Sequence, residues 1–282
     1  MSIRRNSSNR PMNALGRIIF TIILVCVFFS VYKNNRQHST VQVSHNQSPV
    51  VREEPVRNPI MRALAESPST QMQREGIAIG VAFDVSGSMK DSLAGINGQM
   101  MSKIKIARQC AMDILKQADS FTQKHPEQTV EVGVFEFSSR QRQPSCRQVI
   151  PFGPINLSAA MSAVGRMVPD GGTPIGDAVI HVKQAMDRTG LKTKHLLVIT
   201  DGENNQGYAP GDVVDVMSRL PDDRRSSVYF FAFDVAADKF NAVRDAGGLV
   251  LSASNGTELQ QTLDYVLMGK ILVEQPEMPG AK

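Results

Sequence analysis

Three short apolar segments that each end at an aspartate constrain this fold more than any other feature of the sequence. The segments are residues 77–83, 196–200 and 228–233, and they lead into Asp84, Asp201 and Asp234. A continuous apolar run of this length is typical of a strand that is buried on both faces. Amphipathic helical patterns lie between the runs. The alternation predicts an α/β fold, with a doubly wound, mostly parallel sheet and helices on both faces, as in Rossmann-like domains.

Other periodic segments complete this domain. An alternating pattern predicts a strand over residues 130–137, and residues 146–152 follow as its partner across a polar turn. Helices are expected in the segments 104–121, 157–167, 175–186, 212–220, 236–245 and 258–267. The domain is expected to span residues 76–270, with a C-terminal tail at 271–282. About 195 residues provide ample apolar side chains for one core.

The N-terminal part has a different character. Residues 18–32 carry no charge, and the segment is preceded by a short basic stretch, residues 1–17. These features predict one transmembrane anchor, with some snorkelling and local thinning of the bilayer. A cleaved signal peptide is the alternative, but the residues that follow are not the small ones that cleavage requires. Residues 33–75 are polar and rich in Asn, Gln, Ser and Pro, which predicts a flexible linker. Within it, residues 60–65 are compatible with one or two helical turns, either transient or docked on the domain.

The charge distribution indicates the topology and argues against nucleic-acid binding. Lys and Arg number 31 and Asp and Glu number 27, so the net charge is +4. The four arginines before residue 18 account for all of it. The positive-inside rule then places the N-terminus in the cytoplasm and the domain outside it, in the periplasm or at the cell surface. No basic run elsewhere suggests a phosphate-binding surface.

The cysteines are too few for a disulfide framework. Cys26 lies in the apolar N-terminal segment, which leaves Cys110 and Cys146 in the domain. We expect both to be buried thiols, although a disulfide between them is the alternative. Because no CxxC pair occurs, a structural zinc site is not expected.

Oxygen-bearing side chains gather around the ends of two predicted strands. Asp84, Ser86 and Ser88 alternate along the turn after the first strand, and Asp201 follows the second. Thr173 lies in a turn of glycine and proline residues between them. Ligands of open α/β sheets bind beyond the carboxyl ends of the strands. If the two strands are neighbours, these oxygens meet, and such hard ligands suit Mg²⁺ or Mn²⁺, with Ca²⁺ also acceptable.

This pattern resembles the von Willebrand factor A (VWA) domain and its metal-ion-dependent adhesion site (MIDAS), over about residues 76–270. All five MIDAS positions match the residues just named. The resemblance implies that Ser86 and Ser88 bind the metal directly, and that Thr173 does so directly or through water. It implies that Asp84 and Asp201 act mainly through water. It further implies that a partner protein's Asp or Glu carboxylate completes the coordination. The expected protein is a membrane-anchored bacterial member of this family.

Other residues near the site are open to more than one interpretation. Asp177 and Glu203 are candidates for supporting the metal ligands from behind, although surface or capping roles explain them equally well. Asp234 lacks companion hydroxyls and is given no role. The stretch at residues 90–102 is longer than is usual for the family and is expected to lie beside the site. Because Asp84 and Asp201 repel each other without metal, removing Asp201 is expected to keep or even raise stability.

Three functions are compatible with such a site. A metal-dependent protein-binding module, for adhesion or assembly, is the main expectation, and it is not an enzyme. A metal-dependent hydrolase is the second, but Ser86 stands where the second acid of a D-x-D phosphatase would be. The P-loop and the nucleophile elbow are also missing from the sequence. A partner subunit of an AAA-type ATPase is the third, and it would require a cytoplasmic domain.

Overall fold

The computed structural model describes residues 57–65 and 73–273. The predicted membrane anchor, residues 18–32, lies outside these ranges, as do the basic N-terminus, most of the linker and most of the tail. Within the described ranges, no helix has both the length and the apolar character needed to cross a bilayer.

The described elements alternate along the chain as the sequence predicts. The strands are β1 (Arg74–Asp84), β2 (Ser92–Ala94), β3 (Met100–Ser102), β4 (Val130–Phe137), β5 (Cys146–Ile150), β6 (Leu191–Thr200), β7 (Ser227–Phe233) and β8 (Leu249–Ala253). The helices are α2 (Arg57–Ala65), α3 (Lys103–Lys124), α4 (Leu157–Gly165), α5 (Ile175–Arg188), α6 (Pro210–Ser218), α7 (Asn241–Asp245) and α8 (Gly256–Val266). Short helical turns are η1 (Gly87–Lys90), η2 (Asp222–Arg224), η3 (Ala237–Phe240) and η4 (Leu267–Ile271).

Six strands form one sheet in the order β5-β4-β1-β6-β7-β8. Strand β1 pairs in parallel with β4 on one side and with β6 on the other. The pairs β6–β7 and β7–β8 are also parallel, and only β5 at one edge runs antiparallel. The predicted fold class, a mostly parallel α/β sheet, is confirmed, and its order reverses between β1 and β6.

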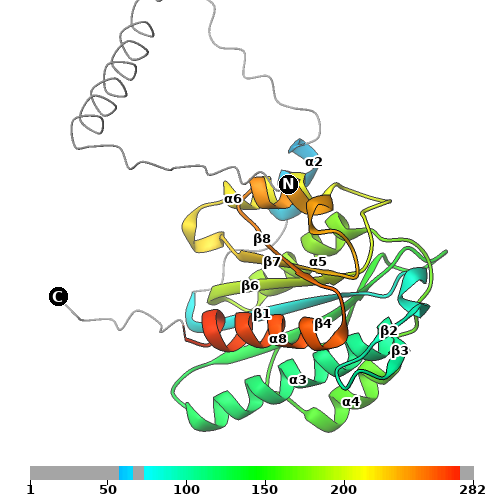
Figure 1. The fold of residues 1–282 in the computed structure, drawn as a ribbon. Coiled ribbons are helices and arrows are strands. Elements are labelled where there is room, and N and C mark those ends of the chain that lie inside the picture. The colour runs from blue at the N-terminus through cyan, green and yellow to red at the C-terminus, as the bar shows by residue number, and fades with distance from the viewer. Residues whose placement is uncertain (1–56, 66–72, 274–282) are drawn as a thin grey trace, which may run out of the picture. The chain divides into compact units, whose positions relative to one another are not determined.

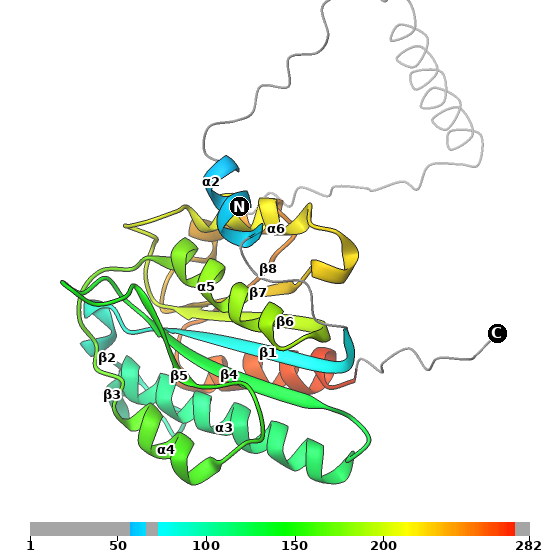
Figure 2. The same cartoon turned by 180° about the vertical axis from the view of Figure 1, so that it is seen from behind.

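The central strand β1 shows why the sheet is covered on both faces (Figures 1 and 2). Ile79 and Phe83 point into one core with α3, α4 and α8. Ala78 and Ala82 point into the other core with α5, α6 and α7. Gly80 lies on this second face, where a Cβ would approach Val182 of α5 to 2.5 Å. Small residues on one side of β1 therefore allow α5 to pack closely over the centre of the sheet.

The structure differs from the sequence prediction at several places. The edge strand β8 was not predicted, because only some of its residues are buried and its pattern is short. Strand β6 begins at Leu191, before the apolar run that marks its second half. Residues 90–102 contain the hairpin of β2 and β3, a pair of three-residue strands. Cys110 and Cys146 are both buried and free, as expected.

A helix lies inside the segment predicted to be a flexible linker. Helix α2 packs against α5 and α6, with Ile60 and Leu64 fully buried in the second core. The sequence left open a transient or a docked helical turn here, and the structure shows the docked form. The docking depends on tertiary contacts, because nine residues are too few for a stable isolated helix.

The C-terminal end of α2 is held by two side chains of the domain. Gln184 donates to the carbonyl oxygen of Ala63 at 2.7 Å, and Arg224 donates to that of Leu64, also at 2.7 Å. The cationic side chain of Arg224 suits a helix C-terminus, where unpaired carbonyls carry partial negative charge. Arg224 also approaches Asp187 to 3.9 Å. Helix α2 is thus tied to a charged cluster as well as to the core.

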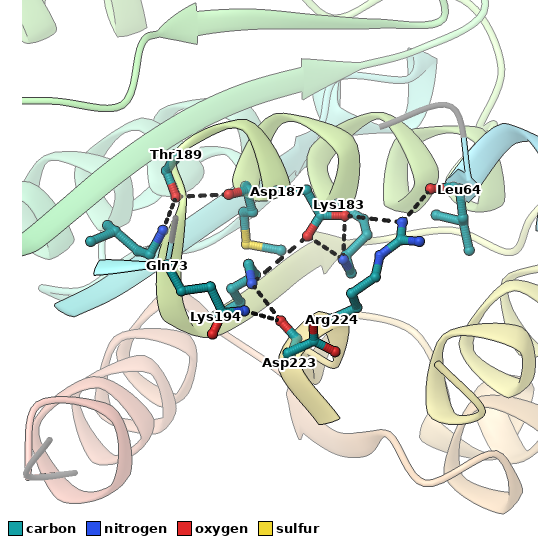
Figure 3. Close-up of polar contacts among 10 residues, drawn as sticks. Leu64, Gln73, Lys183, Asp187, Thr189, Lys194, Asp223 and Arg224 are labelled. Atoms are coloured by element: carbon teal, nitrogen blue, oxygen red, sulfur yellow. Dashed lines mark hydrogen bonds and ion pairs between the residues drawn. The ribbon is translucent and has the colours of Figure 1, made fainter. Parts of the chain in front are cut away.

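That charged cluster holds three cations around one carboxylate (Figure 3). Lys183 forms an ion pair with Asp187, and Lys194 lies 3.9 Å from the same carboxylate. Burial, with the neighbouring cations, outweighs the attraction of Asp187 and lowers the pKa of Lys183 to about 8. The cluster involves the first half of β6, at the opposite end of that strand from Asp201.

Helix α2 should contribute measurably to stability. In a soluble fragment of residues 53–282, Leu64→Ala should lower the free energy of unfolding by about 2–3 kcal/mol, since it removes a fully buried side chain. Met61→Ala on the same helix is the matched control. Its side chain is 46 % exposed, and we expect an effect within about 0.5 kcal/mol. Urea unfolding followed by circular dichroism measures both. Equal midpoints for the two variants would mean that α2 is not docked in solution.

Candidate metal site

The candidate site lies at the carboxyl ends of β1 and β6, where the strand order reverses. The turn that follows β1 is held in place from both sides by backbone bonds. The Val85 amide donates to the carbonyl of Phe137 at 3.0 Å, and the Val85 carbonyl accepts from Asp170 at 2.7 Å. The Gly87 amide donates to the carbonyl of Gly171 at 2.9 Å. The loop that carries Thr173 is therefore bonded directly to the turn that carries the two serines.

Asp84 is fully buried at the end of the central strand. Its Oδ1 accepts from the backbone amide of Ser86 at 2.7 Å, and its Oδ2 accepts from the Thr200 hydroxyl at 2.6 Å. Burial nevertheless raises the pKa of Asp84 to about 7, and the nearby charge of Asp201 adds to the shift. An ionised carboxylate at this depth needs a cation, and a divalent ion would supply it.

The two serine hydroxyls lie next to each other and next to Asp201. Ser86 Oγ and Ser88 Oγ are 3.1 Å apart, and Ser88 Oγ donates to Asp201 Oδ1 at 2.8 Å. Ser86 is buried, whereas Ser88 is half-buried and is the member of this chain of oxygens that reaches solvent. Strands β1 and β6 are neighbours, which is the condition under which the sequence analysis expected these oxygens to meet.

Thr173 lies beside this group, on the loop whose Gly171 is bonded to Gly87. It is buried, and its backbone amide donates to Asn205 Oδ1 at 2.8 Å. Its hydroxyl faces the turn after β6, because a Cβ placed on Gly202 would lie 3.6 Å from Thr173 Oγ1. Gly171, two residues earlier, has a φ of +81°, and a Cβ there would lie 2.1 Å from the carbonyl oxygen of Ser139. Only glycine fits this position, and it fixes the path of the loop towards Thr173.

Lys103 is a residue of this site that sequence reasoning missed. Its Nζ lies 3.1 Å from Asp201 Oδ2 and 2.8 Å from Asp234 Oδ2, so it bridges the two carboxylates. Burial disfavours the ammonium form, but the bonds to Asp234 and Asp201 outweigh burial and raise the pKa of Lys103. The expectation that removing Asp201 would raise stability omitted this counter-ion. Removing Asp201 would leave the buried ammonium of Lys103 with one partner fewer, so the stability of the fold should fall instead.

Asp177 and Glu203, the candidates for supporting roles, form no described hydrogen bond or ion pair with any of the five predicted ligands. Asp177 Oδ1 accepts from the backbone amide of Tyr208 at 3.1 Å, so it holds the loop that follows β6. Asn205 and Asn204 of that loop bond to Thr173 and to the start of α5, which gives Asp177 an indirect link to the site. Glu203 is exposed and forms an ion pair with Lys239 at 3.0 Å.

Comparison with known families identifies the domain. Residues 79–262 match the von Willebrand factor type A domain, which covers more than half of the chain. The chain belongs to the VWA family. A comparison with curated proteins found no match.

Solved structures share the VWA fold at low sequence identity. The PilB minor pilin from Streptococcus sanguinis aligns with a TM-score of 0.55 and 15 % identity, over 73 % of this chain and 64 % of that one. The vWF domain of the type V pili tip protein Mfa5 from Porphyromonas gingivalis gives 0.55 and 9 %, over 72 % and 98 %. BatB from Bacteroides thetaiotaomicron, described as a conserved hypothetical protein, gives 0.52 and 15 %, over 70 % and 98 %.

The oxygens of this VWA domain fit a hard divalent cation. In an octahedral shell with bonds of about 2.0–2.1 Å, adjacent oxygens lie about 3.0 Å apart. The 3.1 Å between Ser86 Oγ and Ser88 Oγ matches one edge of such a shell. Within the described residues, no cluster of three or more His, Cys, Asp or Glu side chains is arranged for a metal. A cation here would therefore depend on the hydroxyls of Ser86, Ser88 and Thr173 beside the two aspartates.

Removal of the two serine hydroxyls should abolish metal binding. In the 53–282 fragment, Ser86→Ala with Ser88→Ala should eliminate the calorimetric signal of Mn²⁺ or Mg²⁺ binding, because Thr173 and the two aspartates alone are too few ligands. Ser158→Ala with Ser162→Ala is the matched control, since both serines are exposed on α4. The control should bind as the wild type does. Undiminished Mn²⁺ heat in the first variant would place the metal elsewhere.

Proposed function

We propose that this chain is a membrane-anchored protein-binding module, used in adhesion or assembly, whose VWA domain binds an acidic partner through a divalent cation at a MIDAS. The family supports protein interaction, and two of the structural neighbours are a minor pilin and a pilus tip protein. The observation that carries the proposal is the continuous set of oxygens from Ser86 through Ser88 to Asp201 at the carboxyl edge of the sheet.

Different residues of the domain would supply the neutral oxygens and the negative charge of such a site. Ser86, Ser88 and Thr173 supply neutral oxygens, and Asp84 and Asp201 supply the charge. Thr200 and the Ser86 amide orient Asp84, so its oxygens are fixed before any ligand arrives. A bound Mg²⁺ or Mn²⁺ would supply a Lewis-acidic position for a carboxylate oxygen of the partner. Two carboxylates leave the cation only just neutralised, so an Asp or Glu of the partner can form a strong contact.

The same residues favour binding over catalysis. Ser86 occupies the place in which a second acid would act as acid and base, and a hydroxyl cannot replace it there. The ligand set therefore suits a module that holds a partner. We propose that the chain is not an enzyme.

The proposed topology places this domain outside the cytoplasm, through an anchor at residues 18–32. Protease added to intact cells or spheroplasts should digest residues 53–282, because the charge pattern directs the N-terminus inwards. A cytoplasmic marker protein should survive the same treatment. Protection of the domain until the membrane is lysed would contradict this topology and would favour the partner subunit of an AAA-type ATPase.

Partner binding should require the cation and the serines together. A protein that is recovered from solubilised membranes with Mg²⁺ and released by EDTA should bind the Ser86→Ala, Ser88→Ala variant about 30- to 1,000-fold more weakly. This range corresponds to about 2–4 kcal/mol, the usual cost of losing a central contact. The Ser158→Ala, Ser162→Ala control should bind normally. If EDTA leaves the titration of the wild type unchanged, the domain uses another surface.

A further inference from the structure

Lys103 stands where elementary electrostatics disfavours a lysine. It is the first residue of α3, next to the positive end of the helix dipole, and the first turn of α3 contains no acidic residue. Its side chain is only 7 % exposed, so water does little to stabilise the charge. A buried cation at a helix N-terminus persists only where nearby carboxylates compensate for it. Here both compensating carboxylates come from strand ends at the candidate metal site.

The backbone of Asp234 is also in an unfavourable conformation. Its φ of 56° places a residue other than glycine in the left-handed region, which few such residues adopt. The position is maintained by its amide, which donates to the carbonyl of Ala253 at 2.8 Å. The side chain of Asp234 reaches Lys103 from this position. Two local costs, a buried lysine and a left-handed aspartate, are therefore linked in one ion pair beside Asp201.

The long connection between the serine turn and α3 delivers Lys103 to this place. Residues 90–102 contain the β2–β3 hairpin, and the Lys103 amide donates to the carbonyl of Asp91 at 2.8 Å, which closes the base of the hairpin. The other end of the hairpin is fixed to α8, where the Thr257 hydroxyl donates to the carbonyl of Ile96 at 2.9 Å. The position of Lys103 is therefore fixed from two sides.

Lys103 controls how Asp201 presents its oxygens. Oδ2 of Asp201 accepts from Lys103, while Oδ1 accepts from Ser88. The ammonium therefore leaves Oδ1 on the side of the serine hydroxyls. It also offsets one of three negative charges. Asp84, Asp201 and Asp234 contribute −3 when ionised, and Lys103 brings the sum to −2, equal and opposite to the charge of a divalent ion.

We propose that Lys103 is a built-in counter-ion of the candidate metal site, which positions Asp201 and offsets its charge so that the site binds a divalent cation less tightly and an acidic ligand more tightly. The part that concerns acidic ligands rests on the proposed function. The part that concerns the cation does not require a partner. A fixed positive charge a few ångströms away repels the cation and attracts an incoming carboxylate.

The test compares variants of the full-length chain in mild detergent, with Mn²⁺ alone as the first probe. Lys103→Met should bind Mn²⁺ about tenfold more tightly, because the loss of a nearby charge outweighs the loss of one hydrogen bond to Asp201. Lys103→Arg, which keeps the charge, should stay close to the wild type. Lys105→Met is the matched control. Lys105 is exposed two residues further along α3, and its substitution removes the same net charge. It should change Mn²⁺ affinity less than about twofold.

A second variant, at Asp234, keeps the inference testable if Lys103→Met does not fold. Asp234 is 40 % exposed, and asparagine tolerates its left-handed backbone, so Asp234→Asn should fold. It leaves the Lys103 charge less compensated and should weaken Mn²⁺ binding several-fold, opposite in sign to Lys103→Met. Asp238→Asn, at an exposed position nearby, should have little effect. If Lys103 had only a structural role, both Lys103→Met and Asp234→Asn would loosen Asp201 and weaken Mn²⁺ binding.

Acetate is the second probe and tests the part that concerns acidic ligands. Titrated into the Mn²⁺-saturated protein, acetate should bind Lys103→Met several-fold more weakly than the wild type. If the wild type binds no Mn²⁺, the proposed function fails and this inference fails with it. If the wild type binds Mn²⁺ but Lys103→Met binds it no more tightly, or Asp234→Asn binds it no more weakly, only this inference is overturned. Acetate affinity unchanged in Lys103→Met would overturn its second part alone.

Discussion

The carboxylate of Asp84 is the group around which this end of the domain is built. It lies without solvent exposure at the end of the central strand, so each of its oxygens requires a donor from the protein. The Ser86 amide and the Thr200 hydroxyl meet that requirement. The first bond shapes the turn that carries the serines, and the second ties β1 to β6. The geometry of the oxygens follows from satisfying one buried carboxylate.

Electrostatic balance then explains the placement of Lys103 and Asp234, which are not candidate ligands themselves. Asp84, Asp201 and Asp234 follow the ends of β1, β6 and β7, and among the described side chains Lys103 is the cation that bridges Asp201 and Asp234. Thr173 and the serines add oxygens without adding charge. A site built from neutral hydroxyls and partly offset carboxylates can accept a further anion. A site crowded with carboxylates would repel one.

At the other end of β6, a second charged cluster anchors the domain to the segment that precedes it. Arg224 connects Asp187 to the carbonyl of Leu64 in α2, and the buried face of that helix lies in the core with α5 and α6. Helix α5 begins at Ile175, two residues after Thr173. Helix α2 packs against α5, and α5 begins next to the candidate site, although the described contacts do not join α2 to the site directly. The compact unit therefore begins before β1 and includes α2.

The sequence alone determined the class of fold, the position of most elements and the identity of the five oxygen residues. It did so because buried strands and amphipathic helices have different periods, and because a strand that leads into Asp-x-Ser-x-Ser is a local pattern. Only the tertiary structure decided that β1 and β6 are neighbours, which brings Asp201 to Ser88. It also decided the ion pairs of Lys103, the edge strand β8 and the docking of α2. Lys103 resembles any other lysine near a helix start, and α2 is too short to be stable by itself. Their roles arise from contacts between residues distant in the chain, and no local pattern encodes such contacts.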